Sequence, residues 1–294
     1  VVKSTVGVYF SAQAIFRGLQ DAVTTIKEFE QSLAEVQSIL GVTDSELQFF
    51  GEQAVLIGRN FGTSAKEIAD GFALIGSKKP DLLEDAAALA EVTKQADILS
   101  QAAGLTLPEA ADALTKSLNQ FQAPASEAAK FVDILATSQQ RGTARIDALS
   151  ASLKNAGAVA NAFGLSFEDT NVALQALAKG GQEAEEAGTK LRTFLLKLAA
   201  TGDKDLNPAL NSTADILRTL QDRYTDQETG LLNVTELTEI FGDRAVVAAT
   251  TLIGQIDAVE SLNGTLFESG NAFQQAANNT DTLEGSLQKL GQSY

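Results

Sequence analysis

The 294-residue chain is predicted to be all-α, with a long N-terminal helix followed by an array of short capped helices that form a helical bundle. Three observations lead to this prediction. Alternation of apolar and polar residues, which marks a half-buried strand, is nearly absent, whereas apolar residues recur at intervals of three and four. Ser, Thr or Asn followed three residues later by an acid marks several helix starts. Gly or Pro separates one apolar run from the next.

The first predicted element is a long helix over residues 10–40. Its apolar residues form one seam, made of Ile15, Leu19, Val23, Ile26, Phe29, Leu33, Val36 and Leu40. Each step is three or four residues, which is typical of a helix packed along one face. Gly41 then supplies the left-handed residue on which helices often end. We therefore expect residues 1–43 to be an N-terminal association segment.

A repeated joint separates the shorter helices that follow. It consists of Gly, one apolar residue, a Ser or Thr, and an acid three residues after the hydroxyl. Two segments have this form, residues 104–109 (GLTLPE) and residues 164–169 (GLSFED). The hydroxyl oxygen accepts a hydrogen bond from a free backbone N–H, and the acid favours the positive end of the helix. Two further starts are similar, Ser64 with Glu67 and Asn233 with Glu236.

These signals predict helices over residues 44–58, 64–75, 81–102, 107–121, 124–139, 144–161, 167–179, 182–199, 208–222, 234–241 and 244–260. Pro80, Pro124 and Pro208 are each expected in the first turn of the helix that follows. Asp243 is expected to cap the last of these helices.

The segments outside these helices are polar. Residues 202–207 and 222–233 are predicted loops. Residues 44–260 form the expected helical core. Residues 261–294 are predicted to be a polar linker that leads into a further helix, marked by Leu283, Leu287 and Leu290. Because the chain does not begin with Met, we expect it to be a fragment of a longer protein.

The composition argues against most catalytic and metal chemistry. The chain has no His, Cys, Met or Trp, so the usual nucleophilic triads and zinc sites are excluded. The run from Asp203 to Asn207 imitates the start of a calcium loop, but its sixth position is Pro208 and its twelfth is Ala214. We therefore expect no enzyme activity, no cofactor and no metal. The formal net charge of −16 repels a phosphate backbone, so specific nucleic-acid binding is not expected either.

One phrase stands out, Ala187-Gly188-Thr189-Lys190-Leu191-Arg192. Glycine inside a helix costs about 1 kcal/mol relative to alanine. A close approach of another helix explains its presence at position 188. Helix packing is the favoured interpretation, and a binding role for Arg192 is the alternative.

Four segments of the chain resemble the core of phage tail tape measure proteins. The first is residues 29–36 (FEQSLAEV), which is similar to the opening of that core. The second is residues 102–121, which resembles its paired-helix repeat. The third is the phrase at residues 187–192. The last is residues 241–245 (FGDRA), in which Phe241 and Gly242 begin an F-G-x-x-A phrase.

The resemblance implies a structural component of a phage tail, located in the virion within the tail tube lumen or at the tail tip. Such a protein templates tail length and is released ahead of the DNA during genome ejection. The implied partners are further copies of the same chain, with a trimer favoured, the tail tube and tail tip proteins, and transiently the host envelope. Two alternatives remain, a membrane-inserting or pore-forming helical protein and an acidic helical adaptor.

Overall fold

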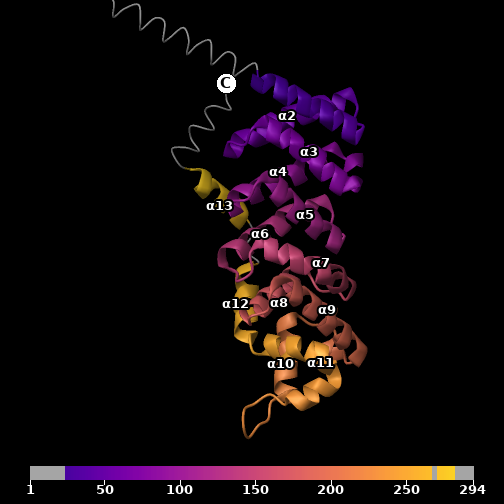
Figure 1. Cartoon of the computed structure of the whole chain (residues 1–294), viewed down its shortest axis with the longest axis vertical. Coiled ribbons are helices and arrows are strands. Elements are labelled where there is room, and N and C mark those ends of the chain that lie inside the picture. The colour runs from indigo at the N-terminus through magenta and orange to yellow at the C-terminus, as the bar shows by residue number, and fades with distance from the viewer. Residues whose placement is uncertain (1–23, 267–269, 282–294) are drawn as a thin grey trace, which may run out of the picture. The chain divides into compact units, whose positions relative to one another are not determined.

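The computed structural model describes residues 24–266 and 270–281 (Figure 1). These residues fall into two compact units. The N-terminal unit lies within Val1–Lys94 and Thr280–Tyr294, and the C-terminal unit lies within Gln95–Asn279. The boundary between them lies inside a helix, whereas the limits expected from the sequence are residues 43 and 260.

The N-terminal unit is built from helices joined by short turns. Its elements are a helix over residues 24–40, α2 (Asp44–Phe61), α3 (Ala65–Lys78), the 3-10 helix η1 (Pro80–Glu84) and the first part of α4 (Ala86–Ala103). Helices α2 and α3 pack together through Phe50 and Phe72, whose ring centroids are 4.9 Å apart. Val36 of the first helix is fully buried, but Ile26 on the predicted seam is 57% exposed. Residues 10–23 of the predicted long helix lie outside the described residues.

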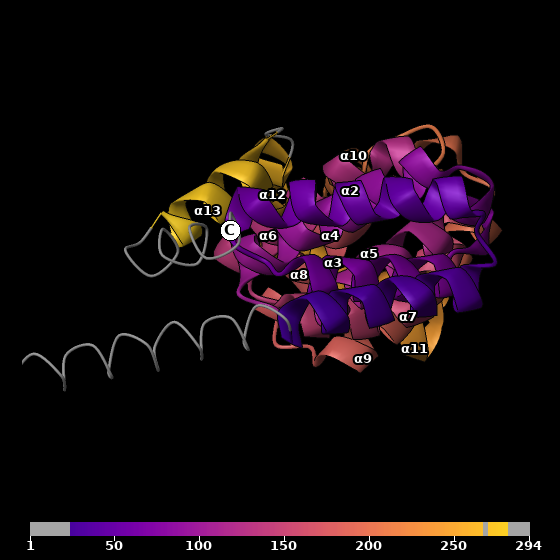
Figure 2. The same ribbon diagram turned by 90° about the horizontal axis from the view of Figure 1, so that it is seen from above.

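The C-terminal unit is an array of helices in two rows, visible in Figures 1 and 2. Its α-helices after α4 are α5 (Leu107–Phe121), α6 (Ala128–Arg141), α7 (Ile146–Ala162), α8 (Phe167–Lys179), α9 (Ala184–Thr201), α10 (Thr213–Tyr224), α11 (Val234–Ile253), α12 (Ile256–Leu266) and α13 (Asn271–Thr280). In one row, α5 packs on α7, α7 on α9 and α9 on α11. In the other, α12 packs on α6, α8 and α10. Most of these helices, from α5 to α12, thus contact the second helix along the chain.

Aromatic side chains join the two rows. Phe131 of α6 and Phe167 of α8 are stacked with ring centroids 4.0 Å apart, and Phe121 of α5 meets Phe167 edge-on at 5.2 Å. Offset and edge-to-face arrangements of this kind are favourable beyond the area that they bury. The core of the described residues is therefore built from Phe, Leu and Ala on short helices.

The helix starts predicted from a Ser, Thr or Asn cap with an acid three residues later are confirmed. Thr106 and Ser64 accept a hydrogen bond from the backbone N–H of Glu109 and Glu67, and each acid bonds back to the backbone of its cap residue. Ser166 and Asn233 likewise accept from the residue three positions on. Gly41, Gly104 and Gly164 have positive φ at the predicted stops.

None of the three prolines expected to do so begins an α-helix, and for Pro80 and Pro208 a side-chain cap further on explains the difference. Pro208 lies in a turn, because Ser212 caps α10 by accepting from the N–H of Asp215. Pro80 begins η1, and α4 starts afresh at Ala86 where Asp85 accepts hydrogen bonds from two backbone N–H groups. Pro124 precedes a 3-10 turn, Ala125–Glu127, that leads into α6.

The end of the core also differs from the prediction. The expected helix over residues 244–260 is broken at Gly254 and Gln255, between α11 and α12. The expected linker after Ser261 is helical over the end of α12 and over α13, because α13 is held by contacts from distant helices that local sequence does not reveal. Leu283, Leu287 and Leu290 lie outside the described residues. Both predicted loops contain local order, the 3-10 helix η3 (Lys204–Leu206) and an isolated antiparallel bridge between Thr225 and Leu232.

Candidate functional site

Gly188 marks the point where α9 crosses α7. A Cβ atom added at Gly188 would lie 2.2 Å from the backbone oxygen of Ser152 and 2.8 Å from its Cα. Because real Cβ atoms do not approach so closely, only glycine allows the two backbones this separation. Helices α7 and α9 have the most extensive contact of any helix pair described. The crossing is therefore a main junction of the C-terminal unit.

Polar side chains of α7 fasten the first turn of α9 at this crossing. The hydroxyl of Ser152 donates to the backbone oxygen of Ala184, and Asn155 Nδ2 donates to that of Glu185 at 3.3 Å. The backbone of Ser152 lies directly against Gly188 at this point. The close approach thus combines tight packing with specific hydrogen bonds.

The remaining residues of the phrase divide between core and surface. Ala187 and Leu191 are each 1% exposed and belong to the core, as do Phe194, Leu195 and Leu198 further along α9. Thr189 and Arg192 are exposed. The structure therefore brings Ala187, Gly188 and Leu191 together at the junction and leaves Thr189 and Arg192 at the surface.

The F-G-x-x-A phrase lies on α11, which also packs on α9. Phe241 of α11 is fully buried, and its ring centroid is 5.2 Å from that of Phe194. Gly242 has φ 69° and ψ 169°, a conformation open to glycine but strained for other residues, and it kinks α11. No described side chain crowds Gly242, since the nearest atom to an added Cβ is Lys197 Nζ at 3.9 Å. The two phrases are therefore connected by α9, because the first lies on this helix and Phe241 of the second packs against its Phe194.

A cavity beside this junction is too small for a ligand. It has a volume of about 10 Å³ and is enclosed mostly by apolar side chains of α9 and α10, among them Leu191, Phe194, Leu195 and Leu217. That volume is at the lower limit for a single water molecule, and an apolar lining offers water no partners. The chemistry of the junction is that of helix packing.

The acidic run that imitates a calcium loop forms ion pairs instead. Arg223 of α10 contacts the carboxylates of Asp203 and Asp205 with its two terminal nitrogens. The hydrogen bond from Arg223 lowers the pKa of Asp203 below its ordinary value, with a smaller contribution from the backbone N–H of Asp205. Among the described residues, no three potential ligand side chains are grouped so as to hold a metal ion.

The fold also uses a buried glutamine that the sequence does not reveal. Gln175 of α8 is 1% exposed, accepts from the N–H of Ala144 at 2.7 Å and donates to the oxygen of Ala144 at 2.8 Å. Gln139 Oε1 accepts from the N–H of Ile146 at 3.0 Å. These two side chains hold the turn between α6 and α7. A glutamine in an Ala-rich helix is usually exposed, so sequence pattern offers no signal for this role.

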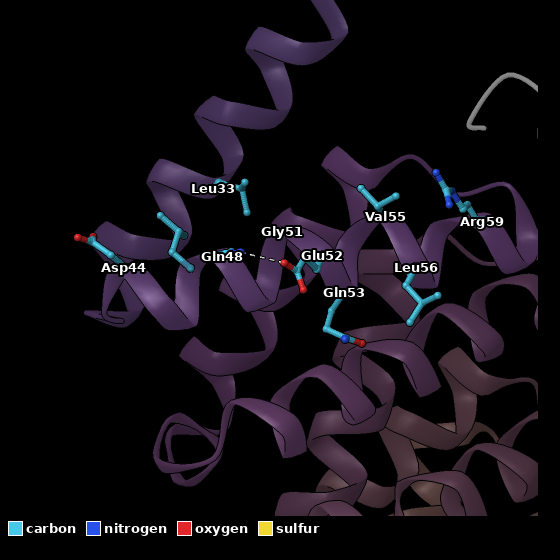
Figure 3. Close-up of a pocket in the computed structure, with 10 residues that line it drawn as sticks. Leu33, Asp44, Gln48, Gly51, Glu52, Gln53, Val55, Leu56 and Arg59 are labelled. Atoms are coloured by element: carbon cyan, nitrogen blue, oxygen red, sulfur yellow. Dashed lines mark hydrogen bonds between the residues drawn. The ribbon is translucent and has the colours of Figure 1, made fainter. Parts of the chain in front are cut away.

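A surface groove lies in the N-terminal unit between the helix over residues 24–40 and α2 (Figure 3). It has a volume of about 930 Å³ and is widely open to solvent. Its apolar residues are Leu33, Leu47, Val55 and Leu56, with Asp44, Glu52 and Arg59 among its charged ones. Leu56 is 57% exposed. The groove is a partly apolar surface beside the predicted association helix.

No single helix in the described part of the chain has the length and apolar character of a membrane span. Helix α11 and residues 256–262 meet that description together, but they are bent by 63° at their junction. Phe241, Ala249 and Leu252 of this pair are buried in the C-terminal unit.

Comparison with known proteins gives a consistent result. A family model described as phage-related minor tail protein matches residues 51–293. The tape measure protein of Pneumococcus phage Dp-1 is 23% identical over 281 residues, which are 91% of this chain and 24% of that protein. The probable tape measure protein of Clostridium phage phiCD119 is 22% identical over 278 residues, 94% of this chain and 29% of that protein.

The chain therefore spans about a quarter of the length of these two relatives, 24% and 29%. No solved structure matches it significantly. The family match includes the crossing at Gly188 and the kink at Gly242, so the same residues that form the junction lie within the matched region. Since the family model matches most of the chain, this all-α protein belongs to the phage-related minor tail protein family, that of the phage tail tape measure proteins.

Proposed function

We propose that this chain is a non-catalytic structural segment of a tape measure protein that lies in the tail tube lumen, contributes to setting tail length and leaves ahead of the DNA. The family match carries the proposal. The geometry supports it, because the two family phrases, at residues 187–192 and 241–245, are used for packing of α9 on α7 and α11. Their buried residues hold helices together, and the adjoining cavity of about 10 Å³ leaves no room for a substrate.

The charge of the chain fits a lumen through which DNA must pass. The formal net charge is −16, and from Thr201 onward five basic residues stand against fourteen acidic ones, a net of −9. A surface of this sign repels the phosphate backbone and so limits adhesion of the passing duplex. The proposed partners are the tail tube and tail tip proteins, with transient contact to the host envelope during ejection.

Tail length offers a direct test. An in-frame deletion of 30 codons from a helical region of the full tape measure gene should shorten the tail by about 45 Å, because an α-helix rises about 1.5 Å per residue. Duplication of the same 30 codons is the matched control and should lengthen the tail by the same amount. Tail lengths are measured on electron micrographs of purified virions. Unchanged lengths in both variants would contradict the proposal.

We also propose that the chain associates with copies of itself through the helix over residues 24–40 and the groove beside it, as a trimer, the state that the resemblance to tape measure proteins favours. Ile26 and Leu56 are each 57% exposed in the described unit, so apolar surface remains uncovered on both helices. Closed rotational symmetry is the usual outcome when identical chains associate. The groove is open along α2, which suits a helix of a second copy.

The double variant Ile26→Lys with Leu56→Lys should weaken this association, since two charges are placed in the proposed interface. The matched control is Leu210→Lys with Leu231→Lys, which changes two exposed leucines, 67% and 69% exposed, in the C-terminal unit. Light scattering coupled to size exclusion gives the mass of each. A trimeric parent, a trimeric control and a monomeric double variant are expected. A double variant with the mass of the parent would show that this surface is not the interface.

A further inference from the structure

Helix α13 is attached to the rest of the C-terminal unit by little apolar surface. Of its apolar side chains, Ala272 and Ala276 are buried, at 1% and 0% exposure, whereas Phe273 is 53% exposed. Burial of two methyl groups contributes little compared with burial of Leu or Phe side chains. By contrast, α8 buries Phe167, Val172, Leu174 and Leu177.

The N-terminus of α13 is held by a carboxylate from α6. Asp133, 9% exposed, accepts a hydrogen bond from Gly270 N–H at 2.8 Å and another from Ala272 N–H at 2.9 Å. Asn271 Nδ2 donates to Thr137 Oγ1 at 2.8 Å. Asp133 therefore acts as an N-cap supplied by another helix, and its negative charge lies at the positive end of α13.

The other end of α13 is held by a complementary contact with α4. Asn279 Nδ2 donates to the backbone oxygens of Gln101 and Ala102, at 3.0 and 3.2 Å. These carbonyls lie in the last turn of α4, where helices generally need acceptor partners from outside the helix. Between the two ends, Gln275 donates to Gln140 at 3.0 Å. Polar contacts thus fasten α13 along its whole length.

We propose that α13 is a strap that detaches from α6 and α4 as one piece while the rest of the C-terminal unit stays folded. A helix of 10 residues is marginal alone in water, so α13 is expected to lose its structure when its contacts break. Detachment breaks few apolar contacts, and the polar groups that it exposes can form hydrogen bonds with water. Detachment also exposes Asp133 and Thr137 on α6, whose oxygens accept hydrogen bonds from the N-terminal residues of α13. The inference rests on these contacts and does not depend on the proposed role in the tail.

Hydrogen exchange resolved by segment tests the strap. In the parent chain, amides within residues 273–279 should exchange at least about 100-fold faster than those in the centre of α8, because local opening is easier than global unfolding. Asp133→Ala should raise exchange of α13 by a further factor of roughly 10 to 100, since two bonds to a charged group are lost. Exchange of α8 should change little. Asp222→Ala, which removes an exposed carboxylate from α10, is the matched control and should leave α13 unchanged.

A second variant keeps the test decisive if Asp133→Ala fails to fold. Asn279 is exposed, so Asn279→Ala removes only the bonds to α4 and should raise exchange of α13 by roughly threefold or more. Chymotrypsin should then cleave after Phe273 faster than in the parent, because cleavage needs an unfolded segment. Equal exchange of α13 and α8 in the parent would overturn the strap. So would an equal acceleration of both helices in Asp133→Ala, or unchanged exchange of α13 in Asn279→Ala.

Discussion

Phe241→Ala should lower the free energy of unfolding of the C-terminal unit by about 3–5 kcal/mol, the usual range for removing a buried aromatic ring. Phe241 is fully buried and its ring lies 5.2 Å from that of Phe194. Truncation leaves a cavity beside the tightly packed helices α7 and α9. The kink at Gly242 limits how far α11 can move to fill it. We expect α9 and α11 to lose their mutual packing first.

Phe273→Ala is the matched control for this prediction, because it makes the same change at a phenylalanine that is 53% exposed. Its effect should stay within about 0.5 kcal/mol, as for most surface substitutions. Urea titration followed by circular dichroism gives both values, with the transition of the C-terminal unit assigned by segment-resolved hydrogen exchange. If the two variants unfold at the same urea concentration, Phe241 is not part of the core that the structure describes.

Gly188→Leu should cost about 3 kcal/mol, at the upper end of the usual range for overpacking, because the added side chain meets backbone. An added Cβ alone would lie 2.2 Å from Ser152 O, so α7 and α9 must separate to admit any larger residue. Gly188→Ala therefore tests whether a larger residue at this position raises or lowers the free energy of unfolding. Helix propensity alone favours alanine over glycine by about 1 kcal/mol, whereas the crossing predicts that alanine destabilises.

Thr189→Leu controls for this series. It places the same side chain one residue further along α9 at an exposed position, and it should change stability by less than about 0.5 kcal/mol. Thermal unfolding should show a melting temperature lower by roughly 6–12 °C for Gly188→Leu and near that of the parent for the control. A Gly188→Ala variant more stable than the parent would show that the two helices do not cross closely at this position.

Short-range interactions explain why most helix starts and stops can be predicted from the sequence. A cap such as Thr106 bonds to Glu109 only three residues away, so the signal and the structure occupy the same short segment. The same holds for Ser64 with Glu67 and for the glycine stops with positive φ. Periodic apolar residues likewise report which face of a helix is buried, as in α9 from Ala187 to Leu198. The helical class and most helix starts follow from these short-range interactions.

Where short-range signals compete, the sequence pattern misleads. Pro208 has the residue type of a helix start, but Ser212 supplies a side-chain acceptor that a proline cannot, and α10 begins after it. Gly242 lies between the predicted helices over residues 234–241 and 244–260 and kinks α11 as expected, whereas the break at Gly254 falls inside the segment 244–260 that was predicted to be one helix. Local signals of similar strength decide such boundaries, so a sequence pattern places a helix end only approximately.

Contacts between distant segments have no comparable signal. Gln175 holds the backbone of Ala144 over a separation of 31 residues, and Asp133 caps α13 over separations of 137 and 139. Both side chains belong to types that are mostly exposed, and nothing nearby in sequence distinguishes them from surface residues. The partner of Gly188 is another such case, since a helical glycine indicates a close crossing without identifying the helix that crosses. Which helix packs on which depends on the fit of whole surfaces, and this fit exists only once the chain has folded.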